Sequence, residues 1–174
     1  MISTPLQENP VPSTMSASDE LSVSGPQLGK NGKTFDDCMV VRNLVFVEEQ
    51  GVPAENELDQ DETRCWHWAV YSGTTPVGAV RLVSPPHPYG DGPDKDLEGN
   101  YLKLGRLAVD KACRGRGIGR ILVQTVVDFA RKNPHLVGPR NIDGSEIEGE
   151  WDGRILAHAQ TKVKKVPAIS TKML

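Results

Sequence analysis

The sequence predicts a mixed α/β fold in which amphipathic helices flank one sheet, and three observations carry this prediction. Two apolar runs, residues 66–71 and 77–83, are joined by a five-residue turn rich in Gly, Thr and Pro and so predict a β-hairpin. A third apolar run, residues 101–109, predicts a buried strand. The segment 117–131 follows a glycine-rich turn and repeats apolar residues with the spacing of a helix that buries one face.

A further helix is expected over residues 34–49. Thr34 is placed to cap its N-terminus, and acidic residues follow in the first turn, where they complement the helix dipole. Gly51 and Pro53 end this helix. The loop that follows, residues 54–64, carries five acidic residues. Such a loop is usually only solvated, but it also has the charge to attract a cationic amine such as a polyamine, a lysine side chain or an aminoglycoside.

Length and composition set bounds on the function. A chain of 174 residues fits one domain with a sizeable core. A formal net charge of −3 argues against general nucleic-acid binding, and no apolar run reaches the roughly 18 residues that span a membrane. Three cysteines without paired spacing and only 4 His support neither a disulfide framework nor a zinc site. We therefore expect no metal, no nucleic acid, no membrane partner and a reducing compartment, namely the cytoplasm, with the nucleus left open.

The two ends of the chain differ in composition from its middle. Residues 1–28 are rich in Ser, Pro and small polar residues and are expected to be a largely disordered leader, although residues 21–23 have the pattern of a short edge strand. The leader has no Arg and contains Glu8, so it does not fit a mitochondrial transit peptide. We expect the folded domain to occupy residues 29–174, with an atypical C-terminal segment at 160–174.

The turn between the third strand and the helix has the features of a phosphate-binding loop. Glycines let the backbone approach a ligand closely, the N-terminus of the next helix is electropositive, and Arg114, Arg116 and Arg120 add charge. A nucleoside-triphosphate loop requires Lys-Ser or Lys-Thr after the glycines, which these glycines lack. The dinucleotide fingerprint requires a different glycine spacing after a first strand. The pattern that remains is Arg-x-x-Gly-x-Gly, which Arg114, Gly117 and Gly119 match.

This loop resembles that of the GNAT N-acetyltransferase superfamily, the acyl-CoA N-acyltransferases. A second stretch, residues 42–53, is similar to the Arg-x-x-Val-Phe-Val-x-Glu-Gln segment of one subgroup of small acetyltransferases. The resemblance covers about residues 34–166 and implies a twisted, mostly antiparallel sheet flanked by helices. It also implies that a last strand, residues 154–159, splays from its neighbour to admit the pantetheine arm of the cofactor.

The resemblance implies direct acetyl transfer from acetyl-CoA, as cosubstrate, to a primary amine of a small molecule or protein, without a metal. The pyrophosphate is expected on seven residues: Arg114, Gly115, Arg116, Gly117, Ile118, Gly119 and Arg120. The pantetheine arm is expected along Leu107, Ala108 and Val109, and a backbone N–H of this strand is expected to stabilise the oxyanion. Glu49 is the candidate base, since Arg106 stands where some relatives place a catalytic Glu.

The C-terminal segment departs from the family pattern. Residues 160–174 contain no Tyr, whereas these enzymes commonly use a Tyr after the last strand to protonate the leaving thiolate. This departure favours a second hypothesis, a catalytically weak CoA-binding or interaction module, and an exposed strand edge would favour a homodimer. A third hypothesis, RNA binding through the Arg-Gly turn and the C-terminal lysines, is disfavoured because no aromatic residues interleave with these charges.

Overall fold

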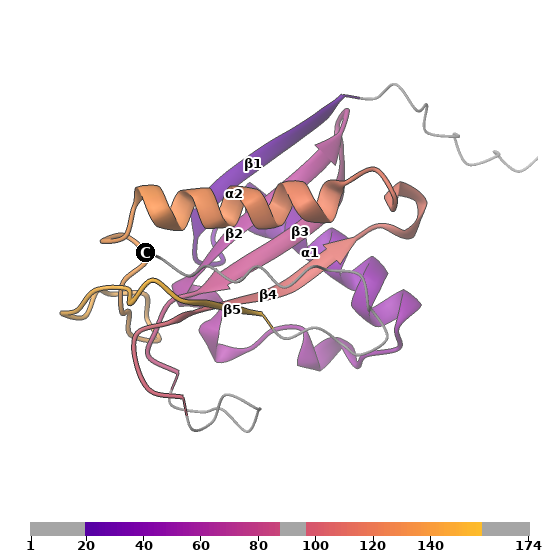
Figure 1. Ribbon diagram of the computed structural model, residues 1–174. Coiled ribbons are helices and arrows are strands. Elements are labelled where there is room, and N and C mark those ends of the chain that lie inside the picture. Colours follow the sequence, from indigo (N-terminus) through magenta and orange to yellow (C-terminus); the bar gives the residue numbers. More distant parts are fainter. Residues whose placement is uncertain (1–19, 88–96, 158–174) are drawn as a thin grey trace, which may run out of the picture.

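The computed structural model describes residues 20–87 and 97–157, which form a five-stranded sheet with helices on both faces (Figure 1). The strands follow one another across the sheet in chain order. The first three pairs are antiparallel, and only β4 and β5 run parallel. The predicted fold class is therefore confirmed. The strands are β1 Leu21–Leu28, β2 Cys65–Ser72, β3 Thr75–Val83, β4 Leu102–Val109 and β5 Ile155–Ala157.

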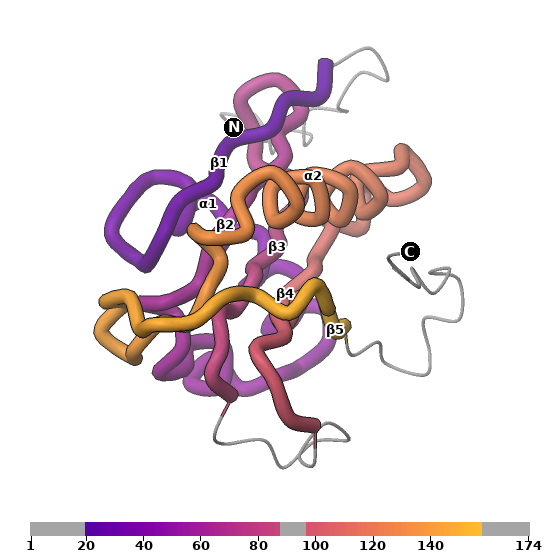
Figure 2. Tube along the Cα trace, turned by 60° about the vertical axis from the view of Figure 1, so that its left-hand side comes forward, coloured from indigo at the N-terminus to yellow at the C-terminus, as the bar shows by residue number. Residues whose placement is uncertain are grey.

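Two longer helices cover opposite faces of the sheet (Figures 1 and 2). The first, α1 (Lys33–Arg42), continues into a π-helix, η1 (Asn43–Glu49), so the expected helical run is confirmed, although its second half is wound more widely. The second, α2 (Ile118–Lys132), agrees with the predicted segment. Three short 3-10 turns complete the helical elements of the described residues: η2 Ala54–Asn56, η3 Gln60–Arg64 and η4 Lys111–Cys113. Across both described ranges, no helix is long and apolar enough to cross a membrane.

The alternation of side chains along β2 divides the interior into two layers. Trp66, Trp68 and Val70 belong to the larger core cluster, which α2 covers. Ala69, between them, belongs to a smaller cluster under α1. His67 is 0% exposed, which confirms that it is a packed strand residue. The α2 face is therefore filled by bulky apolar side chains, and the α1 face by small and polar ones.

The edge strand near the start of the described chain is longer than the sequence predicts. The short edge strand expected at residues 21–23 extends to Leu28 as β1. Residues 1–19 lie outside the described part of the chain. Because β1 pairs with β2 along most of its length, with a bulge between Ser24 and Gln27, ladder hydrogen bonds stabilise a segment whose apolar pattern is weak.

The predicted cap of α1 is also wrong. The N-cap position is Gly32, and no side chain caps this end. Thr34 lies inside the helix, with its Oγ1 2.8 Å from Oγ of Ser24 in β1. The Thr34 hydroxyl, which the sequence pattern assigned to capping the N-terminus of α1, thus bonds to a strand residue instead.

Two further predictions differ in extent. The turn of the β2–β3 hairpin is tighter than expected, since only Gly73 and Thr74 lie between the strands, and Gly73 has a φ of +59° that suits glycine. The last strand is described only over Ile155–Ala157. The rest of its predicted length, 158–159, and the atypical segment 160–174 lie outside the described residues.

Candidate active site

β4 carries an irregularity in the middle of the sheet. Its register with β3 shifts so that Val80 stands opposite two residues, Arg106 and Leu107. This is a β-bulge, and Arg106 has a φ of +50°. On its other side, β4 pairs with β5 only over residues 102–104. As far as the structure describes the chain, the edge of β4 beyond the bulge is open.

The hydrogen bonds of the β3–β4 ladder show which backbone groups face this open edge. Asp110 donates its N–H to the carbonyl of Val77 at 2.9 Å. Bonded and non-bonded positions alternate in an antiparallel ladder, so the N–H and C=O of Val109 point away from β3, whereas those of Ala108 point toward it. The Val109 carbonyl accepts from Nε of Arg114 at 3.1 Å. The Val109 N–H therefore lies on the open edge, where the pantetheine arm is expected.

The turn from β4 to α2 has the backbone form that a phosphate-binding loop requires. Gly115 and Gly117 have φ values of +85° and +79°, which favour glycine. A Cβ at either position would meet nothing within 4 Å, so the requirement is conformational and not steric. Gly117 is the N-cap of α2, and no side chain caps this end. The N–H groups of Ile118, Gly119 and Arg120 therefore begin the helix without intrahelical acceptors, as an anion site requires.

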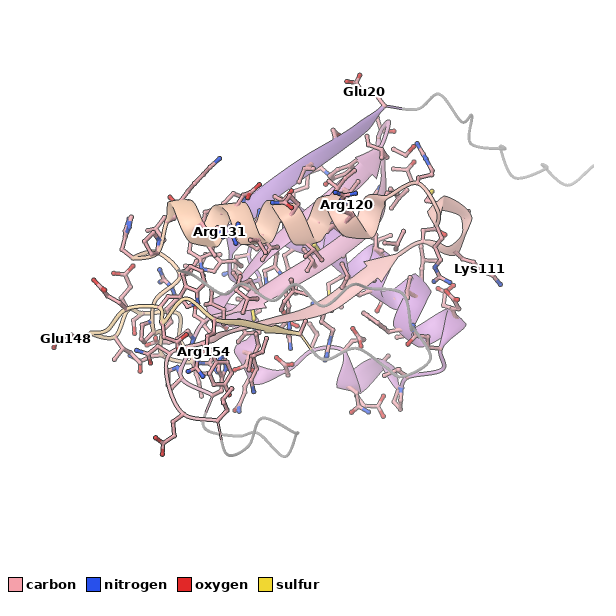
Figure 3. All side chains as sticks on the ribbon, viewed as in Figure 1. Glu20, Lys111, Arg120, Arg131, Glu148 and Arg154 are labelled. Carbon is pink, nitrogen blue, oxygen red and sulfur yellow. The ribbon has the colours of Figure 1, made fainter. Side chains whose placement is uncertain are left out.

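The three arginines of the turn have different partners. Arg114 forms a bidentate ion pair with Glu49, with Nη1–Oε1 at 2.7 Å and Nη2–Oε2 at 2.5 Å. Arg116 donates to Oγ of Ser72 at 3.1 Å and so ties the turn to the end of β2. Arg120 is exposed near the N-terminal end of α2 (Figure 3). In this conformation Arg114 and Arg116 are thus each held by a side chain of another element, whereas Arg120 is exposed.

Glu49 lies beside the glycine turn between β4 and α2, and its ion pair with Arg114 affects its basicity. The hydrogen bond from Arg114 lowers the pKa of Glu49, against a smaller opposing effect of burial. A carboxylate with a lowered pKa accepts a proton less readily. Beside the pair, between η1 and the β4–α2 turn, is an open pocket of ≈ 400 Å³. Its lining residues are Leu44, Val45, Glu48, Glu49, Asp110 and Lys111.

The acidic loop before β2 is not simply solvated, because two of its carboxylates are buried and paired. Glu57 and Glu62 are 3% and 2% exposed. Arg42 of α1 pairs with both, at 3.2 Å from Oε2 of Glu57 and 2.7 Å from Oε1 of Glu62. Arg81 of β3 pairs with Glu62 at 2.7 Å and with Asp59 at 2.6 Å. Arginines from elsewhere in the fold therefore neutralise these carboxylates.

Arg106 completes this arrangement. Its Nε lies 3.4 Å from Oε2 of Glu57, its Nη2 lies 3.6 Å from Oδ2 of Asp59, and Nη2 donates to the Asn56 carbonyl at 3.0 Å. These pairings do not follow from local sequence patterns, because the partners lie far apart along the chain. The one available signal was Arg81, a charge inside an apolar strand that requires a buried partner. We call six residues the charge network: Arg42, Glu57, Asp59, Glu62, Arg81 and Arg106.

Other reactive side chains are engaged elsewhere. Cys38, Cys65 and Cys113 are free and buried, and burial raises the pKa of the Cys38 thiol to about 12. The Tyr71 hydroxyl donates to the carboxylate of Asp37, so it is not offered to a leaving thiolate. Among residues 20–87 and 97–157, no group of three or more His, Cys, Asp or Glu side chains is arranged to hold a metal ion.

Comparison of the sequence with known protein families gives a match that includes η1, β4, the glycine turn and α2. A sequence model of the acetyltransferase (GNAT) family matches residues 35–138. The chain is 36% identical over 99 residues to the uncharacterized N-acetyltransferase YjcF of Bacillus subtilis (strain 168), a match that covers 57% of this chain and 61% of that protein. The chain thus matches less than two thirds of the length of this relative.

Solved structures show the same fold. An acyl-CoA N-acyltransferase from Pseudomonas aeruginosa has a TM-score of 0.51 and 21% identity, over 65% of this chain and 72% of that one. The aminoglycoside acetyltransferase meta-AAC0020, from an uncultured soil metagenomic sample, has a TM-score of 0.52 and 14% identity, over 85% and 83%. At these identities the likeness is one of fold alone. Because the family model spans more than half of the chain, including β4, the glycine turn and α2, the chain belongs to the acetyltransferase (GNAT) family.

Proposed function

We propose that this protein transfers an acetyl group from acetyl-CoA to a primary amine of a small molecule or protein. The observation that supports this proposal is the order in which two binding elements follow each other along the chain. The open edge of β4 beyond its bulge comes first, and the uncapped N-terminus of α2 follows. An extended arm that carries amides and ends in a pyrophosphate requires these two elements in this order.

In this proposal the pyrophosphate binds to residues 114–120. The N–H groups at the start of α2 and the side chains of Arg114 and Arg120 supply its donors. Arg114 exchanges Glu49 for a phosphate oxygen when the cofactor binds. This exchange costs little free energy. The Arg114 side chain is 43% and the Glu49 side chain 31% exposed, and such a surface ion pair contributes only about 0–1 kcal/mol to stability.

The pantetheine arm then lies along Leu107 and Val109, and its thioester reaches the bulge. The amine loses a proton and its nitrogen attacks the thioester carbonyl carbon, which gives a tetrahedral oxyanion. Backbone N–H groups of β4 stabilise this oxyanion. The C–S bond then breaks, the nitrogen releases its second proton to solvent so that the acetyl group stays on it as a neutral amide, and the CoA thiolate takes a proton from solvent.

Glu49 remains the candidate base for the amine. Once Arg114 pairs with the pyrophosphate, the interaction that lowers the pKa of Glu49 is lost, so cofactor binding makes this carboxylate a better proton acceptor. Glu49→Gln is expected to reduce kcat about 100-fold and to remove the acid limb of its pH profile. Glu55→Gln, an exposed change in the acidic loop, is the control. Full activity of Glu49→Gln at every pH would eliminate Glu49 as the base.

Calorimetric titration with acetyl-CoA tests the cofactor site. The double variant Arg114→Ala/Gly117→Asp removes a cation, strains a positive φ and places a carboxylate at the helix N-terminus. We expect its affinity to fall about 100-fold or more. Arg131→Ala, at the other end of α2 (Figure 3), is the matched control. Absence of wild-type binding, or equal binding by the double variant, would contradict the proposal.

A second candidate function is a CoA-binding or interaction module with little or no turnover. It is favoured by the atypical segment 160–174, which lies outside the described residues. Release of CoA thiol with a panel of polyamines, amino sugars, arylalkylamines and peptides separates the two candidates. Turnover with any acceptor supports the enzyme and names its substrate class. Binding of acetyl-CoA without turnover supports the module.

A further inference from the structure

One backbone position in β4 is strained. Within the ranges 20–87 and 97–157, Arg106 is the only residue other than glycine with a positive φ, at +50°. Side chains disfavour this left-handed region, and a residue stays there only where the surrounding structure holds it. Arg106 lies in the bulge, directly before the open edge of β4. Its contacts must therefore hold the bulge in this form.

The side chain of Arg106 is anchored on the acidic loop and not on its own strand. Its three partners, Asn56, Glu57 and Asp59, lie within a few residues of one another at η2. The hydrogen bond from Nη2 to the Asn56 carbonyl fixes one donor direction of the planar guanidinium, and the charges of Glu57 and Asp59, at 3.4 Å and 3.6 Å, hold the group beside the loop. At 27% exposed, the side chain is also largely shielded from water.

The partners of Arg106 are themselves held in place. Glu57 pairs with Arg42 of α1, which also donates to the Glu57 carbonyl. Asp59 pairs with Arg81 of the adjacent strand β3. The loop that contacts Arg106 is therefore fixed to α1 and to β3. Any movement of the bulge would have to break the contact of Arg106 with the buried carboxylate of Glu57 and its half-exposed contact with Asp59.

We propose that Arg106 is a positioning residue for acetyl transfer, which locks the β4 bulge by pairing with Glu57 and Asp59 and so directs the backbone N–H groups that receive the thioester carbonyl. This inference rests on the proposed function and adds a residue to it. A bulge bends its strand and increases the local twist, so its geometry decides where the N–H groups of Leu107 and Val109 point. Arg106 acts through the backbone and touches no reacting atom.

The chemistry of the side chain agrees with this role. Burial lowers the pKa of Arg106, with a further lowering by Arg81 and an opposing effect of Glu57. An arginine nevertheless remains protonated at neutral pH, so Arg106 neither accepts the proton of the amine nor protonates the thiolate. Its permanent charge suits a fixed contact between two carboxylates.

Three substitutions of Arg106 separate the effect of its backbone conformation from the effect of its side-chain contacts. Arg106→Gly removes the ion pairs but favours the positive φ, Arg106→Ala removes the ion pairs and keeps the strain, and Arg106→Lys keeps the charge without the planar fork. We expect kcat per folded molecule to fall about tenfold or more in the Gly and Ala variants, with partial recovery in the Lys variant. The KM for acetyl-CoA and the calorimetric Kd for CoA should change less than about threefold.

A partner substitution tests the same contact from the other side. Asp59→Asn should reproduce part of the fall in kcat, and the double variant Arg106→Gly/Asp59→Asn should fall no further than Arg106→Gly alone. Arg131→Ala is the control for loss of a surface arginine. A wild-type kcat in Arg106→Gly would overturn the proposal, and so would a lower Tm with an unchanged kcat per folded molecule.

Failure of the proposed function can be distinguished from failure of the Arg106 proposal, since the wild-type protein would then bind no CoA or acetylate no amine. The proposed role of Arg106 in holding the β4 bulge remains testable in that case by amide hydrogen exchange. In Arg106→Gly, faster exchange confined to residues 105–109 and to the acidic loop, with α2 unchanged, supports it. Unchanged exchange in both segments would refute it whether or not an acceptor is known.

Discussion

The two faces of the sheet are held by different interactions. On the α2 face, bulky apolar side chains such as Trp68 pack against Leu122 and Val126. On the α1 face, small residues such as Ala69 and Ala79 leave room for the charge network. Apolar packing is non-directional, whereas ion pairs have fixed partners and directions. The α2 face therefore carries the helix whose N-terminus we propose as the phosphate site, and the α1 face carries the charge network that we propose holds the β4 bulge.

The largest effect is expected on the charged face. Glu62 lies 2.7 Å from both Arg42 and Arg81 and is 2% exposed. Glu62→Gln leaves two buried guanidinium groups with less negative charge, so it should lower the free energy of unfolding by about 3–5 kcal/mol. Denaturant unfolding measures this. Glu55→Gln, an exposed change in the same loop, should stay within about 0.5 kcal/mol, and equal stability of the two variants would refute the role of the ion pairs.

The apolar face should respond to loss of volume. Leu122 is 0% exposed in the cluster beneath α2. Leu122→Ala creates a cavity and should lower the free energy of unfolding by about 2–5 kcal/mol. Gln124→Ala, on the exposed side of the same helix, controls for helix propensity. A loss below about 1 kcal/mol would mean that the side chains of this face repack freely around the lost volume.

The dependence of folding stability on pH should arise mainly from the α1 face and not from the α2 face. Burial lowers the pKa of His67 from 6.5 to about 4, even though Glu62 lies 3.6 Å away and raises it. Between these values the unfolded chain binds a proton that the folded chain does not, so stability falls as pH is lowered through this window, by about 3 kcal/mol at most. His67→Gln should flatten the slope, with the remainder coming from His87, whose pKa is also lowered to about 4, and from carboxylates with a lowered pKa such as Asp59. Leu122→Ala should leave the slope of stability against pH unchanged.

The smallest effect is expected at the contact between α2 and β3. A Cβ on Gly78 would lie 2.6 Å from Cγ2 of Ile118 and 3.1 Å from Cδ1 of Leu122. Gly78→Ala should therefore cost about 1–3 kcal/mol of stability. It should also weaken acetyl-CoA binding, because it displaces the first turn of α2. Adding Ile118→Ala should make the combined loss smaller than the sum, and strict additivity would show that the contact is not tight.

The sequence predicted the elements whose determinants are local. The strand, turn and helix over residues 101–132 were recovered because apolar periodicity and the two positive-φ glycines are properties of neighbouring residues. The cap at Thr34 failed because Ser24, in another strand, took its hydroxyl. The length of β1 was underestimated because much of its stability comes from the ladder to β2.

The candidate site shows the same division. The sequence by itself determined the family, the order of strands and helices, and the glycine turn that presents a helix N-terminus. Only the tertiary structure decided that Arg114 pairs with Glu49, 65 residues away, and that Arg116 turns toward Ser72. It also decided that Arg106 reaches the acidic loop 50 residues earlier in the chain. The physical reason is that a helix or a turn depends on residues within a few positions, whereas an ion pair depends on which distant residues the sheet brings together.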